Sequence, residues 1–283
     1  ISLTHSLTTP RSYLIQVYTH ECVMRDPDDV IKEKKKSSAS SKFVTQYVSV
    51  MFDLLVVFTK ATLIDFSFLE HFYKNTLSST RIATFHKFEI IRYFIALFRN
   101  AKVMQDVKVS ALRLLIVPMF TRSLLSGETN MVDKETLRSI MKDLLMGETA
   151  ECPYSESLRI ELLHLSTVLI RFVGRDMMDH RKELIKFAWN HLKSDDNSSK
   201  QWAFVNVCQF IQVYETPPKI ILQVFVALLR TYQSESASLG RKALCILTPA
   251  LPKRLQPRDL VKAIKWTKKI VYVFLSLSLP LSL

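Results

Sequence analysis

Residue types that bind metals or take part in catalysis gather in one short stretch, KFAWNHLKSDDNSSKQWAFVNVCQF, from Lys186 to Phe210. His191, Asp195, Asp196 and Cys208 supply an imidazole, two carboxylates and a thiol, which are common ligands of zinc. An imidazole near a thiol can also activate that thiol as a nucleophile. Two interpretations follow, either a site with chemistry or two helices joined by a polar turn.

The local pattern favours the two helices. Apolar residues up to Leu192 follow a helical period, residues 193–199 are polar, and a second helical pattern begins at Lys200. Asp195, Asp196, Asn197 and Ser198 are turn and N-cap residue types, because their side chains accept hydrogen bonds from free backbone N–H groups. Trp189 and Trp202 are predicted to pack between helices. We therefore expect no metal site in this stretch.

The rest of the chain also lacks a catalytic constellation. Gly127, Gly147, Gly174 and Gly240 are isolated from one another, so no glycine-rich phosphate loop can form. There is no HExxH, GxSxG or kinase motif, and none of the seven histidines pairs with another at a helical spacing of four. The sequence predicts a protein that is not an enzyme and holds no cofactor and no metal.

Composition points to helices joined by short turns. Only 4 of 283 residues are glycine, and glycine serves the tight turns of hairpins. The formal charge of +13 fits acidic proteins or nucleic acid as partners, or simply a solvated lysine face. No CxxC pair occurs among Cys22, Cys152, Cys208 and Cys245, and three of them have apolar neighbours, so buried free thiols in a reducing compartment are expected.

Helical patterns recur along the chain at a regular spacing. Their expected starts fall near residues 43, 82, 131, 180, 217 and 257. Two helices in about every 40–47 residues are typical of HEAT or armadillo repeats, so the predicted fold class is all-α, an α-solenoid of helical pairs. The clearest pattern is Met131–Gly147, in which Leu137, Ile140, Met141, Leu144 and Leu145 form one apolar stripe. We expect Asp133 as its N-cap and Gly147 as its C-terminal glycine cap. The pattern KIILQVFVALLR, Lys219–Arg230, is apolar nearly all round and is expected to pack on several sides.

These patterns divide the chain into four segments. Residues 1–10 match no pattern, and 11–41 are expected to form a helix and a charged linker rich in Ser and Lys. Residues 42–271 form the predicted solenoid of about five helical pairs. The tail at 272–283 is apolar, but with the residues before it spans fewer than the ~20 residues of a membrane helix, so no membrane association is expected.

Four segments in order carry a resemblance to a known family. They are LIKFAWNHLK (184–193), KIILQVFVALLR (219–230), ALCILTPALPKRL (243–255) and IKWTKKIV (264–271). Together they resemble the HEAT-repeat region of the TRRAP family, the transformation/transcription domain-associated proteins, within the phosphatidylinositol-kinase-related pseudokinases. The resemblance implies a nuclear, non-catalytic scaffold in histone acetyltransferase complexes of the SAGA type, and it implies transcription activators and complex subunits as protein partners.

Charged residues at expected helix ends are the candidates for docking such partners. They are Arg181, Lys182, Lys253, Arg254, Lys268 and Lys269. Activation domains are acidic and carry interspersed apolar residues, so a basic surface attracts them. Nucleic acid is a secondary partner class. The alternative functions are a HEAT-repeat nuclear-transport receptor and a nucleic-acid-binding adaptor.

Overall fold

The computed structural model describes residues 52–53, 84–125, 127, 132–149, 153–231, 237–256 and 258. The chain divides into two compact units, residues 1–133 and 134–283, and each is described by itself. All regular structure in the described residues is helical, which confirms the all-α prediction. No helix within these ranges is long and apolar enough to cross a membrane.

In the first unit the described residues form one helix followed by a second, longer helical rod. The first is α5 (Thr84–Arg99), whose buried face includes Ile91 and Phe94. The rod runs from α6 (Gln105–Ala111) through a π-helical stretch, Leu112–Ile116, into α7 (Val117–Leu125). A proline within a helix loses one hydrogen bond and crowds the carbonyl four residues earlier. The wider turn directly before Pro118 provides room for that ring.

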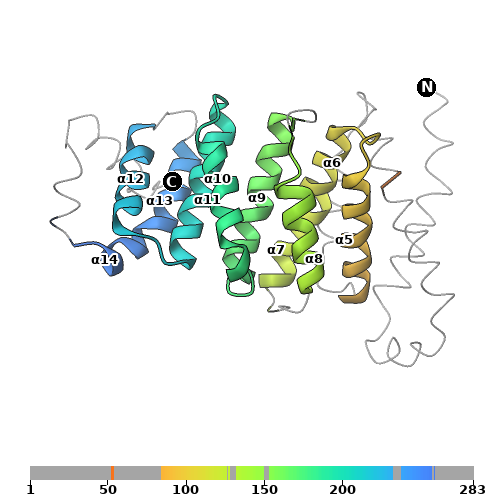
Figure 1. Cartoon of the computed structure of the whole chain (residues 1–283), viewed down its shortest axis with the longest axis horizontal. Helices are drawn as coiled ribbons and strands as arrows, with labels where there is room; N and C mark the ends of the chain where they lie inside the picture. Colours follow the sequence, from red (N-terminus) through yellow and green to blue (C-terminus); the bar gives the residue numbers. More distant parts are fainter. Residues whose placement is uncertain are drawn as a thin grey trace, which may run out of the picture. The chain divides into compact units, whose positions relative to one another are not determined.

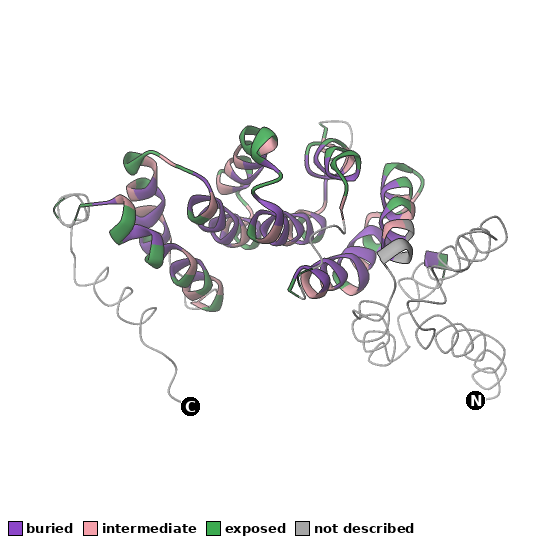
Figure 2. Cartoon of the chain, turned by 90° about the horizontal axis from the view of Figure 1, so that it is seen from below, coloured by how far each residue is buried: buried purple, intermediate pink, exposed green. Residues whose placement is uncertain are grey.

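The described residues of the second unit form three successive helical pairs (Figure 1). The first joins α8 (Lys134–Ser139), which continues as a π-helical stretch (Ile140–Leu145), to α9 (Glu156–Val173). The second pairs α10 (Arg181–Leu192) with α11 (Asn197–Val213), and the third pairs α12 (Pro218–Arg230) with α13 (Ala237–Leu247). A short helix, α14 (Leu251–Arg254), follows. Figure 2 shows buried residues on the sides by which neighbouring helices meet.

The predicted helix starts agree closely with the structure where it describes them. Helices begin at Thr84, Lys134, Arg181 and Pro218, against expected starts near 82, 131, 180 and 217. The starts near 43 and 257 lie outside the described residues, as do the segments 1–10, 11–41 and 272–283. The apolar stripe predicted in the first helix of the second unit is buried, at Leu137, Ile140, Met141, Leu144 and Leu145.

Among the described helices, α11 is the most deeply packed. Helix α11 lies between α9 and α13 and also packs against its partner α10. Every residue of α11 from Ala203 to Ile211 is buried. Helix α12 leaves only Pro218, Lys219, Gln223 and Arg230 exposed, and its other residues, Leu222 and Val226 among them, are buried or packed against the apolar cluster that it shares with α11 and α13. The expectation that Lys219–Arg230 packs over most of its circumference agrees with this burial, since the exposed positions of the run are its three polar residues.

Side-chain hydrogen bonds link the first pair of the second unit to the second pair at the period of the repeat. Asn206 Nδ2 on α11 donates to the carbonyl of Leu163 on α9 at 3.2 Å and to Thr167 Oγ1 at 3.0 Å, across 43 and 39 residues. The hydroxyl of Tyr214 donates to the carbonyl of Gly174 at 2.8 Å, across 40 residues. These separations match the ~40-residue period that HEAT repeats show. The contacts therefore set the register between successive pairs.

Gly147 serves a close approach and not the left-handed cap that we expected from sequence. Among the described glycines only Gly127 has a positive φ, at 85°. A Cβ on Gly147 would lie 2.6 Å from the hydroxyl of Tyr154, which donates to the carbonyl of Leu144 at 3.1 Å. Glycine is required at 147 because the Tyr154 hydroxyl occupies the place of a Cβ while it bonds the Leu144 carbonyl near the helix end.

Candidate partner-docking surface

The stretch from Lys186 to Phe210 folds as parts of two helices and the turn between them. Asp196 is the N-cap of α11, and its carboxylate accepts hydrogen bonds from the backbone N–H groups of Ser198 at 2.9 Å and Ser199 at 3.2 Å. These bonds to the ionised form are among the causes that keep the pKa of Asp196 below its ordinary value, although its partial desolvation acts the other way. Asp195 next to it is exposed. Of the two aspartates, Asp196 therefore caps α11.

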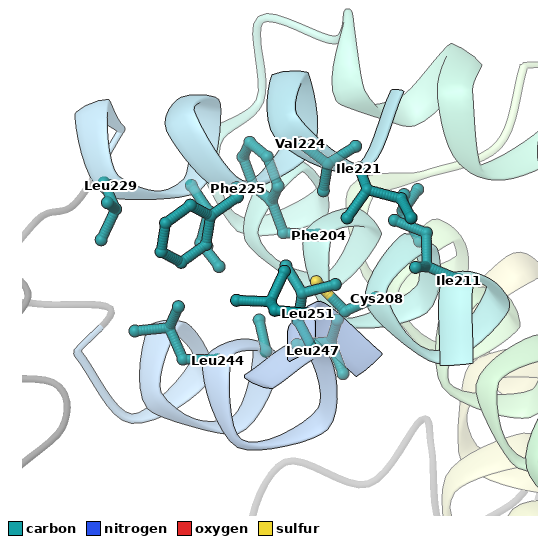
Figure 3. Packing of buried hydrophobic residues seen from close by; sticks show 14 of the residues in the cluster. Phe204, Cys208, Ile211, Ile221, Val224, Phe225, Leu229, Leu244, Leu247 and Leu251 are labelled. Atoms are coloured by element: carbon teal, nitrogen blue, oxygen red, sulfur yellow. The ribbon is translucent and has the colours of Figure 1, made fainter. Parts of the chain in front are cut away.

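The imidazole and the thiol of the same stretch are used for packing. His191 Nδ1 lies 2.8 Å from the carbonyl of Phe187, and burial lowers the pKa of this imidazole. Cys208 is fully buried in the apolar cluster of α11, α12 and α13, and desolvation raises the pKa of its thiol, which leaves it unreactive (Figure 3). Across the described ranges, no group of three His, Cys, Asp or Glu residues is placed to hold a metal ion. Cys245, by contrast, is exposed, so burial was the wrong expectation for that thiol.

The two aspartates provide a matched test of this assignment. Asp196→Ala removes the cap of a central helix and is expected to lower the free energy of unfolding by about 1 kcal/mol, within the 0.5–2 kcal/mol range of N-caps. Asp195→Ala should change it by less than about 0.5 kcal/mol, as other exposed substitutions do. Urea denaturation of both variants measures the difference. A larger loss for Asp195→Ala would contradict the assigned cap.

Three of the predicted docking residues lie at one edge of the second unit. Arg181 and Lys182 are exposed at the start of α10, and Lys253 is exposed on α14. Helices α10 and α11 run antiparallel, so the start of α10 lies beside the end of α11, which α14 also contacts through Arg254 (Figure 1). We call Arg181, Lys182 and Lys253 the basic edge. Lys268 and Lys269 lie outside the described residues.

Arg254 has a structural task at the same edge. Its guanidinium donates to the carbonyls of Ile211 and Tyr214, the latter at 2.7 Å, where α11 ends. The last carbonyls of a helix have no partner within it, and a cation there also interacts favourably with the helix dipole. Charge reversal at Arg254 would therefore disturb helix capping as well as any docking, so this residue is a poor reporter of partner binding.

A second basic cluster, which the sequence did not reveal, lies on the layer formed by α9, α11 and α13. The imidazole of His164 on α9 packs against the indole of Trp202 on α11, with ring centroids 4.9 Å apart. Lys242 Nζ on α13 lies 4.7 Å from the centroid of the same indole, a cation–π contact. Arg171, on α9, is close enough to Lys242 to lower its pKa, after desolvation as the larger cause. We call His164, Arg171, Trp202 and Lys242 the indole patch.

His164 contributes no positive charge to this patch at neutral pH. Burial, and then the neighbouring Lys242, lower the pKa of His164 to about 4. The indole patch therefore carries the two cations of Arg171 and Lys242 around a neutral aromatic pair. The sequence signal for it is the repeat period itself, because His164, Trp202 and Lys242 stand 38 and 40 residues apart. Equivalent positions of successive pairs must lie side by side, which no local motif shows.

The stacked pairs, the repeat-length contacts and the absence of strands in the described residues define an α-solenoid of the HEAT type. The family model described as the Tra1 HEAT repeat ring region matches residues 13–272. The chain belongs to this family.

Curated relatives agree with this assignment. The chain is 38% identical over 235 residues to the probable transcription-associated protein 1 of Dictyostelium discoideum. This alignment covers 80% of the chain and 5% of the relative. It is 36% identical over 114 residues to the SAGA complex/NuA4 acetyltransferase complex subunit TRA1 of Saccharomyces cerevisiae, covering 40% of the chain and 3% of the relative. It is 26% identical over 248 residues to the human transformation/transcription domain-associated protein, covering 79% of the chain and 6% of the relative. The chain thus spans only a small part of the relatives it matches.

Proposed function

We propose that this chain acts as a non-catalytic scaffold segment in a nuclear histone acetyltransferase complex of the SAGA type, where it docks transcription activators and other subunits. The observation that supports the proposal most is the match of residues 13–272 to the Tra1 HEAT repeat ring region. Yeast relatives carry the description of SAGA and NuA4 complex subunits. This family favours a transcription scaffold over the alternative of a nuclear-transport receptor.

The basic edge is the first docking surface that we assign to this function. A solenoid of stacked helical pairs offers a long surface to other proteins. Arg181, Lys182 and Lys253 present positive charge at helix ends, and the chain as a whole carries +13. Such charge attracts acidic, disordered segments and raises their association rate. Lys268 and Lys269 extend the same proposal to the part of the chain that the structure does not describe.

Charge reversal tests this role in the assembled complex. The triple variant Arg181→Glu, Lys182→Glu, Lys253→Glu should reduce recruitment of the complex to promoters, measured by chromatin immunoprecipitation of another subunit. Acetylation of free histones by the purified complex should stay unchanged, because the substituted groups touch no reacting atom. The control is Lys193→Glu, an exposed lysine in the α10–α11 turn at the opposite edge.

An equal loss of recruitment and acetylation while the complex remains intact would contradict the scaffold proposal. Full recruitment by the triple variant would exclude the basic edge as the docking surface. If the direct partner were nucleic acid, its affinity for the chain would fall by orders of magnitude between about 50 and 200 mM salt.

A further inference from the structure

The cations of the indole patch have no carboxylate partner among the described residues. Lys242 contacts the face of Trp202, and Arg171 lies with its guanidinium carbon 5.1 Å from the ring centroid of Phe172. Both side chains belong to exposed residues. Two positive charges near each other repel, and desolvation by the surrounding helices further raises the free energy of the charged forms. The fold therefore maintains an unopposed positive charge at this place.

The exposed residues of the neighbouring helices line up with these cations. On α13 the exposed positions Ser238, Lys242 and Cys245 recur at helical spacing along one stripe. On α11, which lies between α9 and α13, Trp202 is only half-buried while Gln209 two turns later is buried. A partner that crosses the three helices would meet the half-buried indole of Trp202 under Lys242, with Arg171 within electrostatic range of that lysine.

We infer that the indole patch binds an acidic segment of a partner protein, with carboxylates on Lys242 and Arg171 and an apolar side chain against the edge of Trp202. The inference rests on the proposed function, because it names a second place where acidic partners of the scaffold dock. Charge complementarity selects the acidic partner.

The aromatic contacts disfavour nucleic acid as the occupant. Single-stranded nucleic acid binds through bases stacked on free aromatic faces and through a row of cations along its phosphates. Here the indole of Trp202 already packs on His164 and carries the ammonium of Lys242 over its ring. Two cations are also few for a binding mode that depends on many phosphate contacts.

Trp202 provides a direct reporter of binding. In the full 283-residue chain, Trp189→Phe and Trp266→Phe leave its indole as the sole tryptophan, since the sequence has three. The probe is a synthetic peptide in which glutamate alternates with leucine and phenylalanine, and the control peptide carries glutamine in place of glutamate. The acidic peptide should change the fluorescence of Trp202 saturably, because a carboxylate that binds Lys242 alters the cation–π contact. The glutamine peptide should not.

Charge-reversal variants locate the binding. Arg171→Glu with Lys242→Glu should weaken peptide binding about tenfold or more, since two attractive pairs become repulsive. Lys193→Glu should change the affinity for the acidic peptide less than about twofold, because Lys193 is an exposed lysine in the α10–α11 turn. Binding that is not saturable, or an equal loss in the control, would overturn the inference. Tighter binding of a single-stranded oligonucleotide at the same site would overturn it in favour of nucleic acid.

Cys245 gives a second readout that does not depend on fluorescence. Its thiol is exposed one turn beyond Lys242, whereas Cys208 is buried. With Cys22→Ser and Cys152→Ser in place, alkylation of Cys245 should slow when the acidic peptide is bound. Unchanged alkylation at saturating peptide would contradict the assigned location.

The outcomes separate this inference from the proposed function. If reversal of Lys182 and Lys253 abolishes peptide binding and reversal of Arg171 and Lys242 does not, the indole patch is excluded while the basic edge remains. If the peptide binds at the indole patch but the basic-edge variant still recruits the complex, the role of the basic edge fails and the inference stands.

Discussion

Asn206→Asp is expected to destabilise the second unit by about 3–5 kcal/mol at pH 7, the range for an unpaired buried charge. Asn206 is fully buried, and its Nδ2 donates to the Leu163 carbonyl and to Thr167 Oγ1. The substitution keeps the shape of the side chain but places a carboxylate oxygen against a carbonyl oxygen. The loss is therefore electrostatic, with no cavity left behind. Chemical denaturation followed by circular dichroism measures it.

The pH dependence of this variant has a defined sign. Burial raises the pKa of the introduced carboxyl in the folded state above its value of about 3.9 in the unfolded chain. The penalty is therefore absent below about pH 4 and grows as the pH rises, because only the unfolded state then ionises freely. The difference from the parent chain should shrink on acidification. Asn206→Leu, which introduces no charge, should show no such trend, and a pH-independent loss in Asn206→Asp would refute the proposed cause.

Phe225→Ala is expected to cost a similar 3–5 kcal/mol for a different reason. Its ring is 3% exposed and packs in the apolar cluster that α11, α12 and α13 share (Figure 3). Removing a buried ring loses its transfer free energy and leaves a cavity. The matched control is Trp202→Ala, because its indole is larger but partly exposed and should cost roughly half as much. If Trp202→Ala lost more free energy of unfolding than Phe225→Ala, burial would not be what determines which substitution is more destabilising.

The sequence predicted the elements better than it predicted their surroundings. Helix starts, the N-cap role of the turn at 195–198 and the buried stripe of Leu137 and Leu144 follow from local period and residue type. The family resemblance on residues 184–271 is confirmed by the match to residues 13–272. These features depend on neighbours in sequence, which a single chain displays directly.

What the sequence could not predict depends on contacts between pairs. Trp202 packs between helices as expected, but its half-buried position between His164 of α9 and Lys242 of α13 depends on residues about 40 positions away. Helix α11, with its fully buried Asn206, lies between α9 and α13, and no local pattern predicts that central position. Polar residues such as Asn206 make a buried helix look amphipathic, because their hydrogen-bond partners stand about 40 residues away.

The first two pairs of the second unit are completed by side chains that come later in the chain. Tyr154 reaches back to the Leu144 carbonyl, Tyr214 to Gly174, and Arg254 to the end of α11. When synthesis has reached Val213, helix α11 is therefore complete in sequence. The carbonyls at its end and at Gly174 still lack the side chains of Arg254 and Tyr214 that donate hydrogen bonds to them. Expression boundaries for fragments of this region should accordingly be set after Arg254, and a fragment cut at Val213 would expose frayed, protease-sensitive ends at α9 and α11.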